Sequence, residues 1–98
     1  MKAYTHPELT QVTLPQVMQA LSEPCRIAIV QALMVEEELA CNALPVSVAK
    51  ATLSHHMAVL RDAGLILTRI EGTKCLNSLR MEAFDDYFPG LLALIKAA

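Results

Sequence analysis

A short stretch in the middle of the chain carries side chains suited to hydrogen bonding with another large molecule. Its polar members are Lys50, Thr52, Ser54 and His55. Apolar residues recur among and after them at spacings of four and three, namely Leu53, Met57 and Leu60. At about 100° per residue, the apolar set falls within one arc of a helix and the polar set lies outside it. An exposed face of short polar and basic groups is typical of a helix that enters the major groove of DNA, which is about 12 Å wide.

The ends of this helix are predicted from capping residues. Ser47 is a favourable N-cap, and Gly64 is suited to the left-handed position that commonly ends a helix. We therefore expect a helix over Ser47–Ala63, with Ser47 itself close to DNA. His55 lies opposite the apolar arc and is predicted to face DNA. Its neighbour His56 flanks the arc, which indicates a role in packing or in a structural hydrogen bond.

A β-hairpin is predicted directly after the helix. Residues 65–70 are an apolar run with β-branched members, residues 71–73 are a turn containing Gly72, and residues 74–79 mix apolar and polar residues. Helix, tight turn, long helix and hairpin form the winged helix-turn-helix arrangement, in which the hairpin reaches neighbouring phosphates. Its predicted contacts are Arg69, Thr73 and Lys74. Arg61, on the preceding helix, either meets phosphate or faces solvent.

The charge distribution agrees with this assignment, although the net charge of −2 alone does not favour nucleic acid. From Ser47 to Arg80 there are five cations and two carboxylates, which gives +3. The rest of the chain holds three cations and eight carboxylates, which gives −5. A modest basic segment is sufficient in a dimer, because both copies contribute phosphate contacts.

The remaining segments predict further helices, so the fold class is mainly α with one small hairpin. The first dozen residues are expected to be loosely ordered until Val12. The expected helices begin at Pro15, at Pro24 with Ser22 as the cap, and at Glu36–Glu38, where the third helix must stop near Asn42–Pro45. After the hairpin, Glu82–Tyr87 and Gly90–Ala98 form one or two helical pieces interrupted at Pro89. The order is four helices, two strands and a final helix, in a single domain over residues 1–98.

Three segments together resemble a known family. They are LSEPCRIAIVQAL from Leu21, ATLSHHMAVLRDAGLI from Ala51 and RIEGTKCLNSL from Arg69. They resemble the arsenical-resistance-repressor (ArsR) family of winged-helix regulators, and the resemblance extends over roughly Val17 to Leu94. It implies a homodimeric repressor whose two recognition helices meet successive major grooves of a partly palindromic operator. It also implies that the recognition helix begins slightly later, near Lys50.

The same resemblance places the dimer interface on the first and last helices. Hydrophobic residues make up 54% of the chain, and this excess suggests an apolar surface covered by a second copy. The residues expected at the interface are Val17, Met18, Leu21, Leu91, Leu92, Leu94 and Ile95.

Many members of this family release DNA when they bind metal, but neither family metal site is expected here. One version needs two cysteines separated by one residue, and residues 38–42 contain only Cys41. The other needs His together with carboxylates, and residues 81–98 contain no His. No cofactor is predicted. A thiol switch is the next alternative, because Cys25 and Cys41 could approach each other while Cys75 lies in the wing. A small organic ligand, another protein or no effector at all also remain open.

Other functional classes receive less support. An enzyme is not expected, because the sequence has no nucleophile–base arrangement, Gly-rich phosphate loop or paired-carboxylate motif, and Asp85–Asp86 is a solvated helix face. The main alternative is a winged-helix module that binds another protein instead of DNA. The three cysteines match no zinc-finger pattern, and neither a signal peptide nor a membrane span is predicted. We therefore expect a cytoplasmic protein with reduced thiols.

Overall fold

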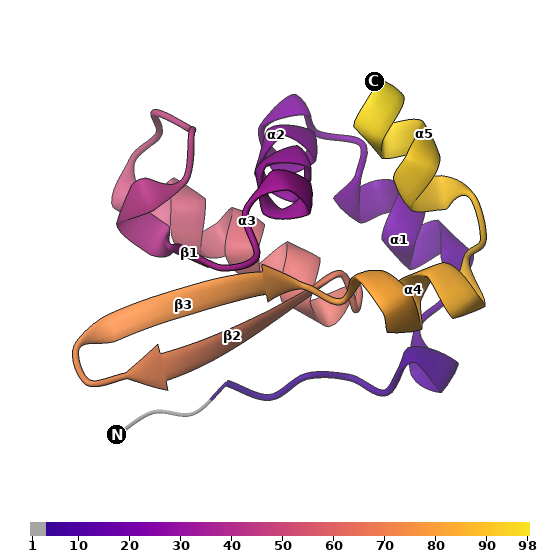
Figure 1. Cartoon of the computed structure of the whole chain (residues 1–98), viewed down its shortest axis with the longest axis horizontal. Coiled ribbons are helices and arrows are strands. Elements are labelled where there is room, and N and C mark those ends of the chain that lie inside the picture. The colour runs from indigo at the N-terminus through magenta and orange to yellow at the C-terminus, as the bar shows by residue number, and fades with distance from the viewer. Residues whose placement is uncertain (1–3) are drawn as a thin grey trace.

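The computed structural model describes residues 4–98, in which helices pack against a small antiparallel sheet and two long strands project from the helical body (Figure 1). The elements are η1 (Leu9–Gln11), α1 (Leu14–Ala20), α2 (Pro24–Val35), β1 (Leu39–Ala40), η2 (Cys41–Ala43), α3 (Lys50–Asp62), β2 (Ile66–Glu71), β3 (Lys74–Leu79), α4 (Met81–Tyr87) and α5 (Leu91–Ala97). Here η denotes a 3-10 helix. The mainly α winged helix-turn-helix fold is confirmed.

The predicted hairpin is present and forms the wing. Strands β2 and β3 pair from Ile66↔Leu79 to Glu71↔Lys74, and Gly72 occupies the turn with φ +63°. A left-handed residue is usual in such tight turns, and glycine adopts it without steric cost. A third strand, β1, adds to the other edge of β3, so that the sheet has the order β1-β3-β2.

The predicted third helix after Glu36 is wrong. Residues 36–38 run as bends and irregular chain, Leu39–Ala40 forms β1, and between Glu36 and Pro45 only the three-residue η2 is helical. Leu39 pairs with Asn77, and Ala40 pairs with Leu76. A helix of so few residues gains few internal hydrogen bonds, because nucleation is costly, whereas pairing with β3 satisfies the same backbone groups.

Two predicted helix caps are also wrong. Helix α3 begins at Lys50, as the family resemblance implied, and Ala49 is the N-cap with extended backbone. Ser47 lies in the preceding irregular chain and is exposed. Glu23, not Ser22, caps α2, because its Oε1 accepts a hydrogen bond of 3.0 Å from the Cys25 N–H. The Ser22 hydroxyl instead donates to the carbonyl of Gln19 at the end of α1.

The core lies where the helices meet the base of the wing. Side chains from four helices and from the start of the wing have no exposed surface: Val17, Ile29, Leu60, Leu65 and Phe84. The prediction that residues before Val12 are loosely ordered is wrong for the described part. Leu9 is buried, and the backbone N–H of Thr68 donates to Nε2 of His6 at 2.9 Å. This segment therefore follows β2 and closes the core (Figure 1).

The C-terminal part forms two short helices, α4 and α5, separated at Pro89 as predicted. Helix α5 packs on α2, where the Gln31 side-chain amide donates to the carbonyls of Ile95 and Ala98. Both α1 and α5 lie on the side of the molecule away from the tip of the wing (Figure 1). Within residues 4–98, no helix has the length and apolar character needed to cross a membrane.

Candidate nucleic-acid interface

The polar face of α3 is open to solvent. Its four predicted contact residues are exposed: Lys50, Thr52, Ser54 and His55. Among residues 4–98, none of these four side chains forms a hydrogen bond or an ion pair with another part of the chain. The apolar positions turn inward, because Met57 and Leu60 are buried and Leu53 packs against the core. The face is therefore available to hydrogen-bond with an external partner.

His56 has the structural surroundings expected from its position in the helix. It is buried, and its Nδ1 lies 3.0 Å from Nη1 of Arg26. Arginine has no acceptor, so Nδ1 must accept this hydrogen bond. Arg26 in turn donates from Nε to the carbonyl of Ala20 at 2.7 Å. This contact joins α3 to α2 and to the end of α1, and no pattern in the sequence predicted the part of Arg26.

Arg61 is half-buried and contacts other residues of the chain. Its Nη1 donates to Oγ1 of Thr68 on β2 at 3.2 Å, and its guanidinium carbon lies 4.2 Å from the centre of the Tyr4 ring. The Thr68 hydroxyl donates to Oδ1 of Asn77 at 2.8 Å, and Asn77 is completely buried. These hydrogen bonds join the end of α3 to the middle of the wing.

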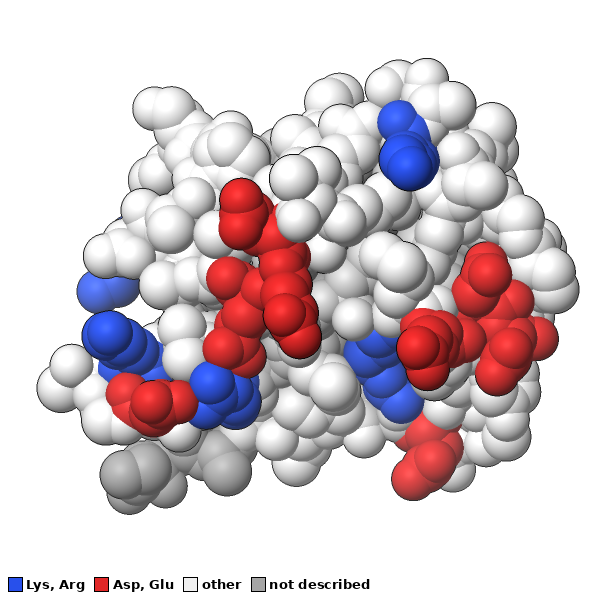
Figure 2. All heavy atoms as spheres, viewed as in Figure 1, with Lys and Arg blue, Asp and Glu red and all other residues white. Residues whose placement is uncertain are grey.

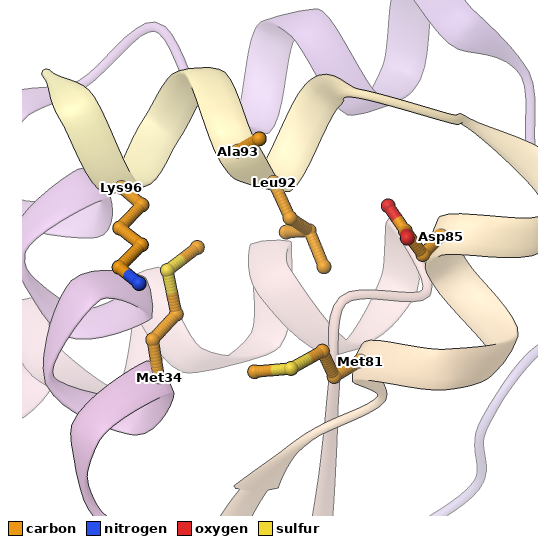
Figure 3. Close-up of a pocket in the computed structure, with 6 residues that line it drawn as sticks. All are labelled: Met34, Met81, Asp85, Leu92, Ala93 and Lys96. Carbon is orange, nitrogen blue, oxygen red and sulfur yellow. The ribbon is translucent and has the colours of Figure 1, made fainter.

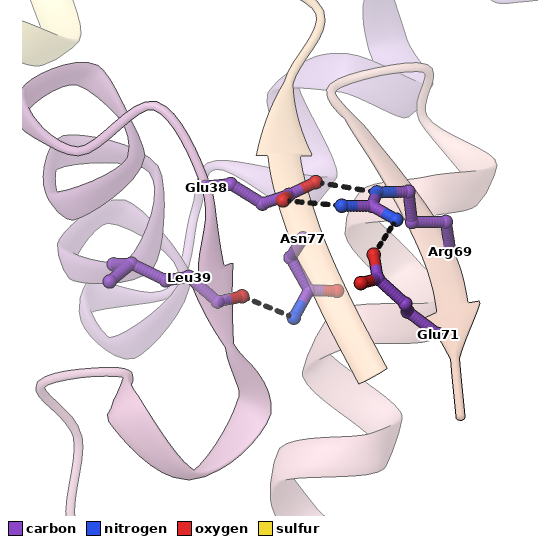
Figure 4. Close-up of polar contacts among 5 residues, drawn as sticks. All are labelled: Glu38, Leu39, Arg69, Glu71 and Asn77. Carbon is purple, nitrogen blue, oxygen red and sulfur yellow. Dashed lines mark hydrogen bonds and ion pairs between the residues drawn. The ribbon is translucent and has the colours of Figure 1, made fainter. Parts of the chain in front are cut away.

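The two cations of the wing are held differently. Arg69 makes two hydrogen bonds of 2.8 Å to the carboxylate of Glu38, which reaches across β3, and it also pairs with Glu71 (Figure 4). Hydrogen bonding to Arg69 lowers the pKa of Glu38, and hydrogen bonds to Glu38 and then Glu71 raise the pKa of Arg69. Lys74, at the tip beside Thr73, is exposed and has no ion-pair partner in the described part of the chain.

The wider charge pattern agrees with this pairing. On the side of the molecule drawn in Figure 2, acidic side chains form one group across the middle and another over α4, while basic and acidic groups are interspersed along the wing. An exposed pair between opposite charges contributes little net field. The uncompensated cations predicted to meet DNA are therefore Lys50 on α3 and Lys74 at the tip of the wing.

Two hollows lie near these elements. One, of about 220 Å³, lies between α3 and the sheet; its lining includes Lys50, Ser54, Arg61 and two thiols, Cys41 and Cys75. The other, of about 330 Å³, lies between α2, α4 and α5, away from the polar face of α3 (Figure 3). Met34, Met81 and Leu92 give it an apolar lining. Within residues 4–98, no three His, Cys, Asp or Glu side chains gather as a metal site would require.

The predicted approach of Cys25 to Cys41 is replaced by a different pair. The Sγ atoms of Cys41 and Cys75 lie 3.2 Å apart in a thiol–thiol hydrogen bond. Cys41 follows β1 directly, and β1 pairs with the strand that carries Cys75. The sequence did not indicate this contact, because β1 itself was not predicted.

Comparison with known proteins places the chain among DNA-binding regulators. A family model described as a helix-turn-helix domain matches residues 21–69. The chain is 39% identical to an uncharacterised helix-turn-helix transcriptional regulator of Bacillus subtilis, YceK, with 79% of this chain and 80% of that protein covered. It is 36% identical to an arsenical resistance operon repressor of Staphylococcus xylosus, with 87% and 82% covered.

Solved structures give the same result for the fold. NolR from Sinorhizobium fredii superposes with a TM-score of 0.66 at 28% identity, with 86% of this chain and 85% of NolR covered. The transcriptional repressor BigR from Xylella fastidiosa gives a TM-score of 0.67 at 26% identity, with 86% and 80% covered. With its winged helix-turn-helix fold, its open α3 face and these relatives, the chain belongs to the ArsR family of DNA-binding transcriptional regulators.

Proposed function

We propose that this protein acts in the cytoplasm as a homodimeric repressor that reads a partly palindromic operator with α3 of each copy. Lys50, Thr52, Ser54 and His55 contact base edges and nearby phosphates in the major groove. Lys74 and Thr73, at the tip of the wing, contact the adjacent backbone. The similarity to an arsenical resistance operon repressor supports repression as the mode of regulation.

The observation that carries this proposal is the open face of α3. Its polar groups are exposed and unpaired within the described residues, whereas neighbouring His56 and Arg61 are engaged inside the chain. Hydrogen bonds to base edges give sequence specificity, and contacts between basic side chains and the DNA phosphates give affinity. Arg69 and Arg61 therefore contribute less to binding than Lys50 and Lys74, because their charges already have partners. Ser47 lies just before α3, where it can reach the phosphate backbone.

The test is a fluorescence anisotropy titration with a labelled fragment of the protein's own promoter and a scrambled fragment of equal length. Binding to the promoter should weaken steeply as salt rises, because each neutralised phosphate releases counterions. The double substitution Lys50→Ala, His55→Ala should remove the preference for the promoter. Lys96→Ala is the matched control, since Lys96 is also an exposed lysine but lies on α5.

Failure has a clear form. If no promoter fragment binds more tightly than scrambled DNA, the proposal is wrong, and a winged-helix module that binds another protein becomes the better explanation. If the control Lys96→Ala remains dimeric and loses specific binding as fully as the α3 double variant, the assignment of α3 as the reading element is wrong.

The dimer interface is the second part of the proposal. Met18 on α1 and Leu94 on α5 are 53% and 65% exposed in the single chain, and Leu14 on α1 is also exposed. Large apolar side chains grouped at the surface are typical of contacts with another chain. Val17, Leu21, Leu92 and Ile95 are already buried in this chain's own core, so they support the interface from beneath and leave the contact to Met18, Leu91 and Leu94.

Sedimentation equilibrium tests this interface. Leu94→Glu should convert a dimer to a monomer, because it would bury a charge without a partner. Val35→Glu is the control: Val35 is 83% exposed at the end of α2, outside both interface helices, and its variant should remain dimeric. A wild-type protein that stays monomeric at all concentrations, or a dimeric Leu94→Glu variant, would exclude this interface.

A further inference from the structure

The contact between Cys41 and Cys75 follows from strand pairing. Strands β1 and β3 pair at Leu39↔Asn77 and Ala40↔Leu76, and the next step of this register sets Cys41 opposite Cys75. Residues directly opposite in an antiparallel pair have Cα atoms about 4.5–5.5 Å apart. This spacing lies within the range of about 4.4–6.8 Å found for disulfides. With Sγ atoms 3.2 Å apart, bond formation needs the sulfurs to close by only about 1.2 Å.

The two thiols are also accessible to a small reagent. Both are partly exposed, and both line the hollow of about 220 Å³ between the sheet and α3. Tyr4 and Ser54 line the same hollow. The third cysteine, Cys25, lies in the first turn of α2 and does not line this hollow.

We propose that Cys41 and Cys75 are a peroxide-reactive dithiol that closes to an intramolecular disulfide and thereby lowers the affinity of the protein for DNA. The Cys41 thiol gives up its proton, and its thiolate attacks one oxygen of hydrogen peroxide. The O–O bond breaks, and the leaving hydroxide takes up that proton, which gives a sulfenic acid and water. The sulfur of Cys75 then attacks the sulfenic sulfur, and the hydroxyl leaves with a proton as a second water. Two thiols are oxidised, and one peroxide is reduced to two waters.

The surroundings of the pair assign the two roles. Burial, followed by the hydrogen bond to Cys41, raises the pKa of the Cys75 thiol. Because the thiolate is the nucleophile toward peroxide, this shift favours Cys75 for the second step, and the hydrogen bond that the Asn77 amide donates to the Sγ of Cys41 supports Cys41 for the first. Cys41 therefore reacts first and Cys75 resolves the sulfenic acid.

A chain of hydrogen bonds joins this dithiol to α3. The Nδ2 of Asn77 donates to the Sγ of Cys41 at 3.3 Å and to the carbonyl of Leu39 at 3.2 Å, the latter shown in Figure 4. Asn77 also accepts from Thr68, which accepts from Arg61 on α3. Closing the bond draws η2 toward β3 and reshapes the hollow whose other wall carries Lys50 and Ser54. The effect on DNA rests on the proposed function; the disulfide itself does not.

The first measurement detects the bond without DNA. The reduced full-length protein is treated with hydrogen peroxide, its remaining thiols are alkylated, and its mass and peptide map are determined. Wild type and Cys25→Ser should each carry two fewer alkyl groups than the same protein alkylated without peroxide, and should yield a peptide that links Cys41 to Cys75. Cys41→Ser and Cys75→Ser should form no intramolecular link. A link through Cys25, or over-oxidation of Cys41 with no link to Cys75, would overturn the proposal.

The second measurement follows promoter affinity before and after peroxide. Oxidation should weaken binding at least fivefold in wild type and Cys25→Ser, a reducing agent should restore it, and Cys41→Ser and Cys75→Ser should not respond. If the bond forms and promoter affinity is unchanged, the coupling to α3 is wrong. If the reduced protein binds no promoter, the proposed function fails, and the mass measurement still decides whether the disulfide forms. Circular dichroism confirms that each serine variant is folded.

Discussion

Helix α3 and the wing meet the same predicted partner, but they hold their polar groups in different ways. The outer face of α3 leaves Lys50 and His55 unpaired in the described chain, while its inner side is fixed by Met57, Leu60 and His56. In the wing, by contrast, Arg69 forms ion pairs with two carboxylates of the same chain, Glu38 and Glu71. A cation in a basic segment is therefore available to DNA only if the fold leaves it without a partner.

The largest expected difference is in stability, and it concerns the glycine after α3 and the glycine in the turn of the wing. Gly64 after α3 has φ +77°, and a Cβ there would overlap Cδ2 of Leu9, whereas Gly72 at the tip of the wing has φ +63° with open space around it. Left-handed backbone costs a residue with a Cβ roughly 1–2 kcal/mol, and overpacking adds roughly 1–3 kcal/mol. Gly64→Ala should therefore lower the free energy of unfolding by about 2–5 kcal/mol, and Gly72→Ala by only about 1–2 kcal/mol. Urea unfolding measures both, and equal losses would contradict the difference in packing.

The two adjacent histidines of α3 should separate stability from binding. His56→Ala removes the acceptor of Arg26 from a buried site, which should cost about 1–3 kcal/mol of stability. His55→Ala should leave stability within about 0.5 kcal/mol, because His55 is exposed, and should weaken promoter binding. Thermal unfolding and the anisotropy titration measure the two quantities. A stable His56→Ala variant with lost promoter binding would reverse the assigned roles.

The two cations of the wing should differ in the salt dependence of DNA binding. Lys74→Ala should reduce the slope of log K against log salt by about 0.9 for each phosphate contact that is lost. Arg69→Ala should change this slope much less, because Glu38 and Glu71 already neutralise the guanidinium. Titrations at several salt concentrations test this expectation. If Arg69→Ala lowers the slope as much as Lys74→Ala does, the Arg69 ion pairs open when DNA binds.

The smallest predicted effect concerns the support of the wing by the N-terminal segment. Burial, followed by the charges of Arg80 and Arg61, lowers the pKa of His6 from its ordinary 6.5, and neutral Nε2 accepts a hydrogen bond from Thr68. As the pH falls, His6 is therefore protonated in the unfolded chain before it is protonated in the folded one. Its contribution to stability is complete above about pH 6.5 and decreases as the pH falls toward the folded pKa. His6→Gln should lose less stability than wild type between about pH 7.5 and about pH 5.5 in urea unfolding. An unchanged pH dependence would show that His6 does not contribute.

Much of the site followed from local pattern. The spacing of Leu53, Met57 and Leu60 is sufficient to predict which face of α3 is buried, and it separates exposed His55 from buried His56. Gly64 marked the end of the helix, and the hairpin was visible in the run after it. Such features depend on the helical period and on single residues with special backbone freedom, so neighbouring sequence is sufficient to find them.

The start of α3 and the segment before it were harder to predict. Three consecutive glutamates favour the start of a helix, yet β1 forms there because Leu39 and Ala40 find partners in β3. Ser47 has the right side chain for a cap, but the extended chain at Ala49 delays the helix to Lys50. At β1, pairing with a distant strand outweighed a local helix preference.

The sequence was sufficient to indicate the family, the order of most elements and the side of α3 that is buried. The partners of the charged and sulfur-bearing side chains, in contrast, depend on contacts between distant segments. Glu38 and Arg69 are 31 residues apart, and Cys41 and Cys75 are 34 residues apart. Both contacts arise because β1 joins the wing, and pairing between strands so far apart leaves no periodic trace in the sequence. Because β1 pairs with β3, Glu38 can form an ion pair with Arg69, and Cys41 lies beside Cys75 near α3.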